Sequence, residues 1–196
     1  MVNNPFQRYR SLLNTYIDQR SLPVLWDNWN HYSRHYHTVE HLKELISGIE
    51  RWRHRLTRAE FEQLILAAFF HDAIYDPKNP ESNEDESIKF FRKAYIGKDQ
   101  KFELVDKAIE CTKHRKRPLD FPLKIFWEAD NSGFRKPFLK FLDIEKKIRK
   151  EYSHVPGDIY KNARIEFLEK NYGLFGPKGD TNIRNLVKWI RDKYDI

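Results

Sequence analysis

Apolar residues return every three or four positions along most of the chain, with polar residues between them. This is the period of an amphipathic α-helix that buries one face. No segment shows a convincing apolar–polar alternation of the kind found in half-buried strands, so the pattern predicts an all-α protein. Seven stripes predict one helix each: Phe6–Ile17, Val39–Ile49, Phe61–Ala68, Phe102–Ile109, Phe138–Ile148, Tyr160–Phe167 and Ile183–Tyr194.

The stripes are separated by short polar segments in which Pro, Gly, Asn and Asp recur. None of these segments has the length or composition of a flexible linker between domains. Thr57 and Glu60 have the spacing of a capping box before the stripe that begins at Phe61. We therefore expect residues 1–196 to form a single domain, a bundle of about eight helices, one of which ends near Asp130.

The composition is that of a packed globular protein with a basic surface. Aromatic residues make up 15% of 196 residues, enough for a full hydrophobic core and enough exposed rings to allow a homodimer. A lone cysteine, Cys111, excludes an intramolecular disulfide and a thiolate zinc cluster. The net charge of +7 suits an anionic partner such as a phosphate ester, a nucleotide or nucleic acid, and suits a merely soluble basic protein equally well.

The chain offers no targeting signal that sequence reasoning can find. Its start, MVNNPFQRYRSLLNTY, lacks the apolar stretch of a signal peptide, and no apolar run approaches the length of a membrane span. We therefore expect a cytoplasmic protein without a membrane partner.

The histidines are unevenly distributed along the chain. Four of the eight fall within HYSRHYHTVEH, residues 31–41. His37 and His41 are four apart, so on a helix they share a face. His41 lies at the edge of the stripe that includes Leu45, which lets it face an interior cleft and still be reached from solvent. For this pair alone, a solvated helix face is the simpler interpretation.

The stretch AAFFHDAIYD, residues 67–76, carries a histidine and an aspartate out of an apolar run. His71 continues the buried row of Leu64 and Ala68. A neutral buried imidazole needs a partner on each ring nitrogen, and a metal on one with a carbonyl or carboxylate on the other would satisfy both. Alternatively, His71 is a core histidine bonded to backbone and Asp72 is a residue of the helix end.

One more acid completes a set. Asp130 ends the sequence FWEAD, so His41, His71, Asp72 and Asp130 come from three separate predicted helices, each beside an apolar stripe. Nitrogen and oxygen donors without a thiolate suit a hard or borderline divalent cation. The expected cofactor is Mn²⁺, Mg²⁺, Fe²⁺, Ni²⁺, Co²⁺ or Zn²⁺, with one or two ions left open.

These residues resemble the motif of the HD superfamily of metal-dependent phosphohydrolases: a histidine, a His-Asp pair and a distant aspartate on helices of an all-α fold. RHYHTVEH, AAFFHDAIYD, SNEDES, EAD and IRKEYSHVPGDIY, in this order, resemble its small stand-alone branch. The resemblance implies an HD-type helical bundle with metal ligands at His41, His71, Asp72 and Asp130. Glu128 stands where the branch would have aspartate, and NSGF after Asp130 is more polar than expected.

The resemblance also implies roles around the metal. Asp72 is expected to be a ligand and to orient or deprotonate the attacking water; His37, and as a second candidate His114, to contact phosphate or a second metal. Tyr75 and Glu84 are expected to support the site, and Asp76 is most simply a turn residue. The cations expected to contact the substrate phosphate are Arg34, Lys113, Arg115, Lys116 and Arg117.

The expected function is metal-dependent hydrolysis of a small phosphorylated molecule or nucleotide. Whether it is a phosphatase, phosphodiesterase or nucleotidase stays open, because pocket walls decide selectivity. The first alternative is a non-catalytic module that binds a nucleotide or metal. The second, less favoured, is a nucleic-acid-binding protein that uses the basic run at 113–117.

Overall fold

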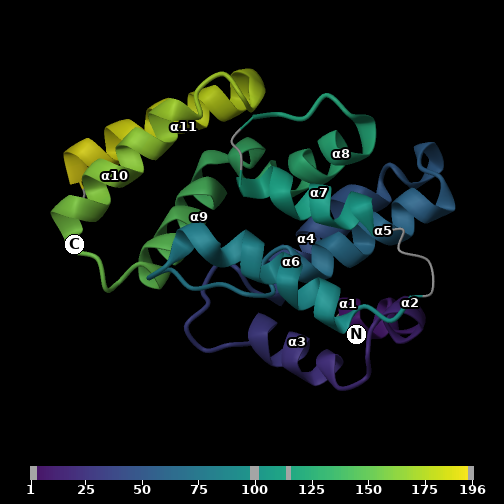
Figure 1. Ribbon diagram of the computed structural model, residues 1–196. Coiled ribbons are helices and arrows are strands. Elements are labelled where there is room, and N and C mark those ends of the chain that lie inside the picture. Colours follow the sequence, from purple (N-terminus) through teal and green to yellow (C-terminus); the bar gives the residue numbers. More distant parts are fainter. Residues whose placement is uncertain (1–3, 98–101, 114–115, 194–196) are drawn as a thin grey trace. The chain divides into compact units, whose positions relative to one another are not determined.

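Eleven α-helices make up the fold in a computed structural model that describes residues 4–97, 102–113 and 116–193 (Figure 1). Within those ranges three short 3-10 helices occur as well and no strand is formed, which confirms the all-α prediction. The α-helices are α1 Pro5–Arg8, α2 Arg10–Tyr16, α3 Ser21–Trp29, α4 Val39–Glu50, α5 Arg58–Phe70, α6 Asn83–Ala94, α7 Glu103–Lys113, α8 Phe121–Asp130, α9 Phe138–Glu151, α10 Gly157–Lys170 and α11 Gly176–Lys193.

The helix number exceeds the predicted eight for local reasons. The stripe Phe6–Ile17 is divided at Tyr9, whose φ of −103° and ψ of 18° end α1 before α2 begins. Helices α3 and α6 carry no stripe that sequence reasoning identified. Helix α6 begins with three acids in its first turn, where negative side chains are stabilised by the positive end of the helix dipole.

The chain divides by its contacts into two compact units, Met1–Asp130 and Asn131–Ile196. The expectation of a single domain over residues 1–196 stays a prediction.

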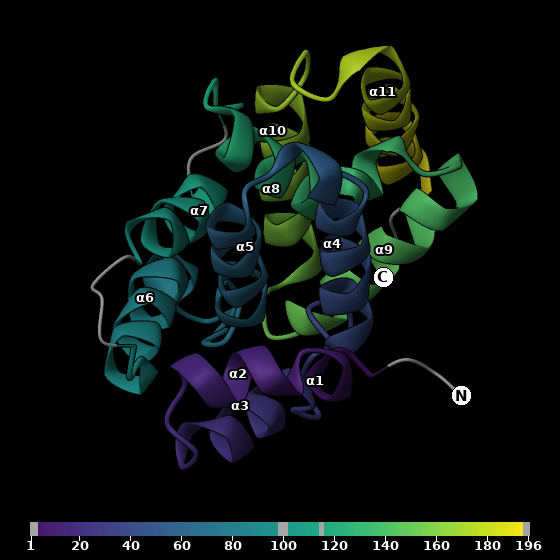
Figure 2. The ribbon, with the colours of Figure 1, turned by 90° about the vertical axis from the view of Figure 1, so that its right-hand side faces the viewer.

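Helix α5 is the central helix of the first unit. It packs against α4, α6, α7 and α8, and Figure 2 shows it between α4 and α7. Every residue from Leu64 to Phe70 is buried, as expected of a helix surrounded on all sides. The predicted capping box is confirmed: Thr57 Oγ1 accepts from Glu60 N–H, and the Glu60 carboxylate accepts from Thr57 N–H. The start of α5 is therefore fixed by its cap and its course by the core.

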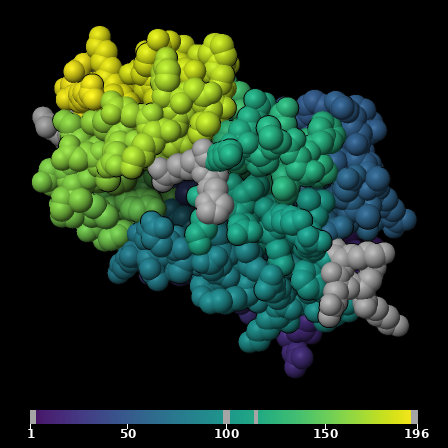
Figure 3. All heavy atoms as spheres, turned by 45° about the horizontal axis from the view of Figure 1, so that its top comes forward, coloured from purple at the N-terminus to yellow at the C-terminus, as the bar shows by residue number. Residues whose placement is uncertain are grey.

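The second unit packs α9, α10 and α11 around a small aromatic core. The rings of Phe134 and Phe175 stack with centroids 3.9 Å apart. Gly173 and Gly176 adopt φ values of 88° and 75°, which residues with a Cβ rarely adopt. Helix α11 begins at Gly176, seven residues before the stripe Ile183–Tyr194 that predicted it. Figure 3 shows α10 and α11 at the green-to-yellow end of the colour scale, forming one continuous surface.

None of the helices in the described ranges is both long enough and apolar enough to cross a membrane.

Candidate metal centre

Three helix ends of the first unit bring the expected ligands together. His41 lies in the first turn of α4, His71 caps the C-terminus of α5 with Asp72 following, and Asp130 is the last residue of α8. Helix α4 packs against both α5 and α8. Helices α4 and α8 approach closely at Gly48, where an added Cβ would lie only 2.5 Å from the Cβ of Ala129. The neighbouring residue, Asp130, is thereby held beside α4.

Four donor atoms converge. The Nε2 atom of His41 lies 3.1 Å from Asp130 Oδ1, and the Nε2 atom of His71 lies 3.0 Å from Asp72 Oδ2. The two Nε2 atoms are 3.4 Å apart. The cross distances, His41 to Asp72 and His71 to Asp130, are 3.9 and 3.6 Å. The same atom of each residue takes part in all of these contacts: Nε2 of the two histidines, Oδ2 of Asp72 and Oδ1 of Asp130.

This spacing fits a metal ion. Ligand atoms about 2.1 Å from one ion lie roughly 3.0 to 3.4 Å apart in octahedral or tetrahedral geometry. Suitable ligand atoms of His41, His71 and Asp72 all lie within 4.8 Å of one another, and Asp130 contacts both imidazoles of this group. These three residues supply two nitrogens and one carboxylate oxygen, and Asp130, which is outside that group of three, would add a second carboxylate oxygen. Nitrogen and oxygen donors of this kind could hold a divalent cation, and the cation itself stays a prediction.

The ring of His71 is fixed in the orientation that metal binding requires. Its Nδ1–H donates to the carbonyl of Ala68 at 2.9 Å, so Nε2 faces the carboxylates. The rings of Trp29 and Phe126 pack against the imidazole, and Trp29 Nε1 donates to the Phe69 carbonyl at 2.8 Å. Sequence reasoning missed both aromatic residues as supports, because they lie 42 and 55 positions from His71 in the chain. Only the Ala68 carbonyl, three residues away on the same helix, could have been expected.

The charged groups of the centre raise the pKa of His71 and lower the pKa of Asp72. Burial alone would lower the pKa of His71, but the charge of Asp72, its hydrogen bond and the charge of Asp130 raise it to about 9. Burial alone would raise the pKa of Asp72, but the positive charges of His71 and His37 hold it far below its usual value. A proton on His71 balances the carboxylates when no cation is bound. A divalent cation would take the place of that proton.

Cys111 is near this centre and is not a ligand of the thiolate type. Burial and then the negative charge of Asp130 raise the pKa of its thiol to about 12. The group stays protonated at neutral pH and donates to the Ala108 carbonyl at 3.1 Å.

His37 reaches the centre, but not from a helix. The expectation that it shares a helical face with His41 is wrong, because Thr38 is extended and α4 begins at Val39. The His37 ring nevertheless lies 5.8 Å from the His41 ring and 4.2 Å from the ring of Tyr75. Tyr75 therefore lies beside His37, and its support of the site stays a prediction.

Glu84 and Asp76 differ in their relation to the centre. Burial, together with the negative charge of Asp72, raises the pKa of Glu84, which places this acid within electrostatic reach of the ligands. Asp76 Oδ1 accepts from Lys78 N–H at 2.9 Å, and Asp76 N–H donates to Asn83 Oδ1 at 2.9 Å. Asp76 is therefore a turn residue, as the simpler interpretation predicted.

The expected phosphate-binding cations are differently placed. Lys113 forms an ion pair with Asp85 at 2.8 Å, Arg117 forms one with Glu128, and Lys116 is exposed. His114 and Arg115 lie outside the described residues. Contact of these side chains with a substrate phosphate stays a prediction.

Arg34 has a structural role that the sequence did not reveal. Its side chain is buried, and its guanidinium donates to the carbonyls of His37 at 3.2 Å, Asp72 at 2.7 Å and Ala73 at 3.1 Å. The aromatic rings of Trp29 and Tyr75 lie 5.3 and 5.4 Å from its Cζ atom. Arg34 thereby holds the segment before α4 against the His71–Asp72 turn. Its contact with a phosphate stays a prediction.

We expect Arg34→Lys to lower the free energy of unfolding by about 2 kcal/mol, because an ammonium cannot satisfy three buried carbonyls arranged for a fork of donors. It should also weaken divalent-cation binding, since Asp72 loses the bond at its carbonyl. Urea unfolding and calorimetry with Mn²⁺ measure the two effects. Arg10→Lys, on an exposed arginine, is the matched control. If Arg34→Lys equals the wild type in both assays, the positioning role is wrong.

No protein-family model, no curated protein and no solved structure matches this chain. The resemblance to the HD superfamily therefore stays a prediction.

Proposed function

We propose that the protein is a divalent-cation-dependent phosphohydrolase that acts on a phosphoester or nucleotide. The observation that carries the proposal is the group of His41, His71 and Asp72, whose ligand atoms lie within 4.8 Å of one another, with Asp130 Oδ1 3.1 Å from His41 Nε2 and 3.6 Å from His71 Nε2. The two imidazoles are buried, whereas the carboxylate side chains of Asp72 and Asp130 keep 17% and 18% of their surface exposed. A substrate can therefore approach from the carboxylate side.

His41, His71, Asp72 and Asp130 would hold the cation. When bound, a divalent cation lowers the pKa of a coordinated water and offsets the negative charge that develops on a phosphoryl group. His71 is kept in the required tautomer by Ala68, and Trp29 and Phe126 exclude water from its inner side.

Asp72 is assigned to orienting the attacking water. Its pKa is depressed by the neighbouring imidazoles, and a carboxylate with a low pKa is a weak base. It stays ionised at neutral pH and can accept a hydrogen bond from water without taking the proton.

His37 is the group best placed to contact the substrate phosphate. Its charge acts on Asp72, and its ring is braced by Tyr75 at 4.2 Å. An imidazole N–H can donate to a phosphoryl oxygen.

The test is hydrolysis of a panel of phosphomonoesters, phosphodiesters and nucleotides with Mn²⁺, Mg²⁺, Ni²⁺ or Co²⁺, against EDTA. We expect turnover with at least one cation, and at least about a 100-fold loss in Asp72→Asn and in Asp130→Asn. Asp76→Asn is the matched control, because asparagine can keep the turn hydrogen bond.

Two other outcomes of the phosphoester panel would argue against a phosphohydrolase at this centre. Tight binding of a cation and a nucleotide without turnover would favour the non-catalytic binding module. Turnover that survives both substitutions and EDTA would contradict the proposed centre.

A further inference from the structure

The second unit carries most of the net positive charge of the chain. Residues 131–196 contain fifteen Lys and Arg against nine Asp and Glu, a net charge of +6, whereas residues 1–130 contain 21 against 20, a net charge of +1. The candidate metal centre lies in the nearly neutral first unit. The excess charge of the second unit is therefore not explained by the proposed function, and it points to an anionic ligand of its own.

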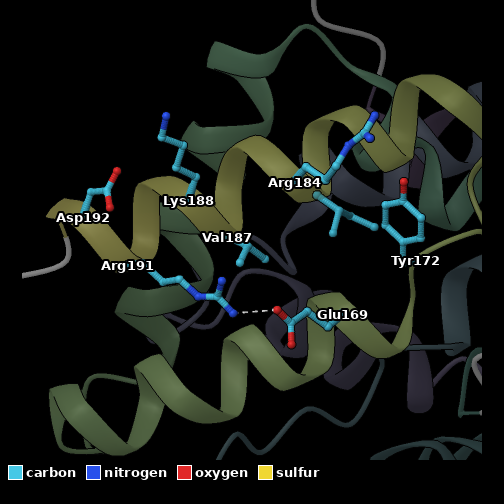
Figure 4. A pocket seen from close by; sticks show the side chains of 8 residues that line it. Glu169, Tyr172, Arg184, Val187, Lys188, Arg191 and Asp192 are labelled. Atoms are coloured by element: carbon cyan, nitrogen blue, oxygen red, sulfur yellow. Dashed lines mark hydrogen bonds and ion pairs between the residues drawn. The ribbon is translucent and has the colours of Figure 1, made fainter.

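A hollow of about 530 Å³ between α10 and α11 lies within this basic unit. Figure 4 shows charged and polar side chains around Val187: Glu169 and Tyr172 on one side, and Arg184, Lys188, Arg191 and Asp192 from α11. Ile183 and Val187, both buried, complete the lining with apolar surface. The volume lies in the range of pockets that hold small ligands.

Three cations and two carboxylates line this hollow: Arg184, Lys188 and Arg191 against Glu169 and Asp192. Arg191 is offset by Glu169, whose carboxylate lies 2.8 Å from its guanidinium. Arg184 and Lys188 are four residues apart on α11, so they share a helical face, and both are exposed. A single anionic group is therefore favoured beside Arg184 and Lys188, away from the carboxylate of Glu169.

A flat apolar surface lies next to that charge. Tyr172 is 49% exposed, and the Cζ atom of Arg184 lies 5.8 Å from the centre of its ring. An exposed aromatic ring beside an arginine suits a planar ring that stacks, as nucleobases stack on aromatic side chains. The hollow thus offers cations for a phosphate and a platform for a base at a short distance from each other.

We propose that the hollow binds a nucleotide unit, with the phosphate on Arg184 and Lys188 and the base on Tyr172. Guanidinium and phosphate pair through two parallel hydrogen bonds, and Lys188 adds a point charge. The unit can come from a free mononucleotide or from a single strand of nucleic acid. Both sources share this chemistry.

Calorimetry of the full-length protein in EDTA tests the proposal with adenosine monophosphate, inorganic phosphate and a short single-stranded oligonucleotide as probes. EDTA removes any contribution that requires a cation at the first unit. We expect the double variant Arg184→Gln/Lys188→Gln to bind adenosine monophosphate at least about tenfold more weakly than the wild type. The control is Lys146→Gln/Lys147→Gln, which removes the same charge from exposed positions of α9.

A second variant separates stacking from charge. Tyr172→Leu should weaken adenosine monophosphate binding and leave inorganic phosphate binding unchanged.

If the oligonucleotide binds more tightly than the mononucleotide and its affinity falls steeply with salt, the source is a nucleic-acid strand. If both double variants lose the same affinity for adenosine monophosphate, the effect comes from net charge alone and the proposal is wrong. The proposal is also wrong if the wild type does not bind adenosine monophosphate. Hydrolysis by the first unit is scored separately in the phosphoester panel.

Discussion

His71→Ala is expected to abolish stoichiometric binding of a divalent cation and to leave the helical circular dichroism largely unchanged. The Nε2 atom of His71 lies 3.0 Å from Asp72 Oδ2, 3.4 Å from His41 Nε2 and 3.6 Å from Asp130 Oδ1, so it is close to all three other donors. Asp72→Ala should have the same result. Each substitution removes one of the three residues whose ligand atoms lie within 4.8 Å of one another, and leaves two of that group.

Thermal unfolding with and without Mn²⁺ gives the measurement, beside elemental analysis of the purified protein. A cation at about 100 times its dissociation constant stabilises the wild type by about 2.7 kcal/mol. For a chain of this size that corresponds to a rise in Tm of roughly 5 to 10 °C. The rise should disappear in both variants.

His54→Ala is the control, since His54 is exposed in a 3-10 helix outside the centre. Unchanged metal content in His71→Ala and Asp72→Ala together would show that the ligand assignment is wrong. Loss of metal in His54→Ala as well would point to nonspecific histidine binding.

The position of His71 could be predicted because it follows from periodicity within one helix. The row of Leu64 and Ala68 sets the direction of the side chain, and α5 keeps that direction to its last turn. The proximity of Asp130 was predicted only from compatible chemistry. Its cause is tertiary: α4 and α8 approach closely at Gly48 and Ala129, a contact that no local pattern encodes.

Other features depended on backbone detail that the sequence pattern does not resolve. A spacing of four placed His37 on a helix with His41, but the extended Thr38 starts α4 two residues after His37. Arg34 looked like a phosphate-binding cation because of its neighbours in sequence. Two of its three carbonyl partners lie 38 and 39 residues away, which only the folded chain brings into reach.

The second unit has a buried polar network that no pattern predicted, and we expect it to be a main source of its stability. Glu145 on α9 has no exposed surface, and its carboxylate accepts from Tyr160 Oη at 2.9 Å and from Arg164 Nε at 2.8 Å, both on α10. Burial by itself would lower the pKa of Arg164, but the charge of Glu145 raises it, so the guanidinium stays charged.

Glu145→Ala is therefore expected to lower the free energy of unfolding by about 3 to 5 kcal/mol, because it leaves the guanidinium of Arg164, whose side chain is only 11% exposed, without its counter-charge. Urea unfolding provides the value. Glu166→Ala, which removes an exposed carboxylate paired with Lys170 at 2.5 Å, should cost about 0.5 kcal/mol or less. The double variant Glu145→Met/Arg164→Met should recover much of the loss, since it removes the unpaired charge and keeps the volume apolar. If the double variant is as unstable as Glu145→Ala, the loss comes from packing of α9 against α10 and not from the stranded charge of Arg164.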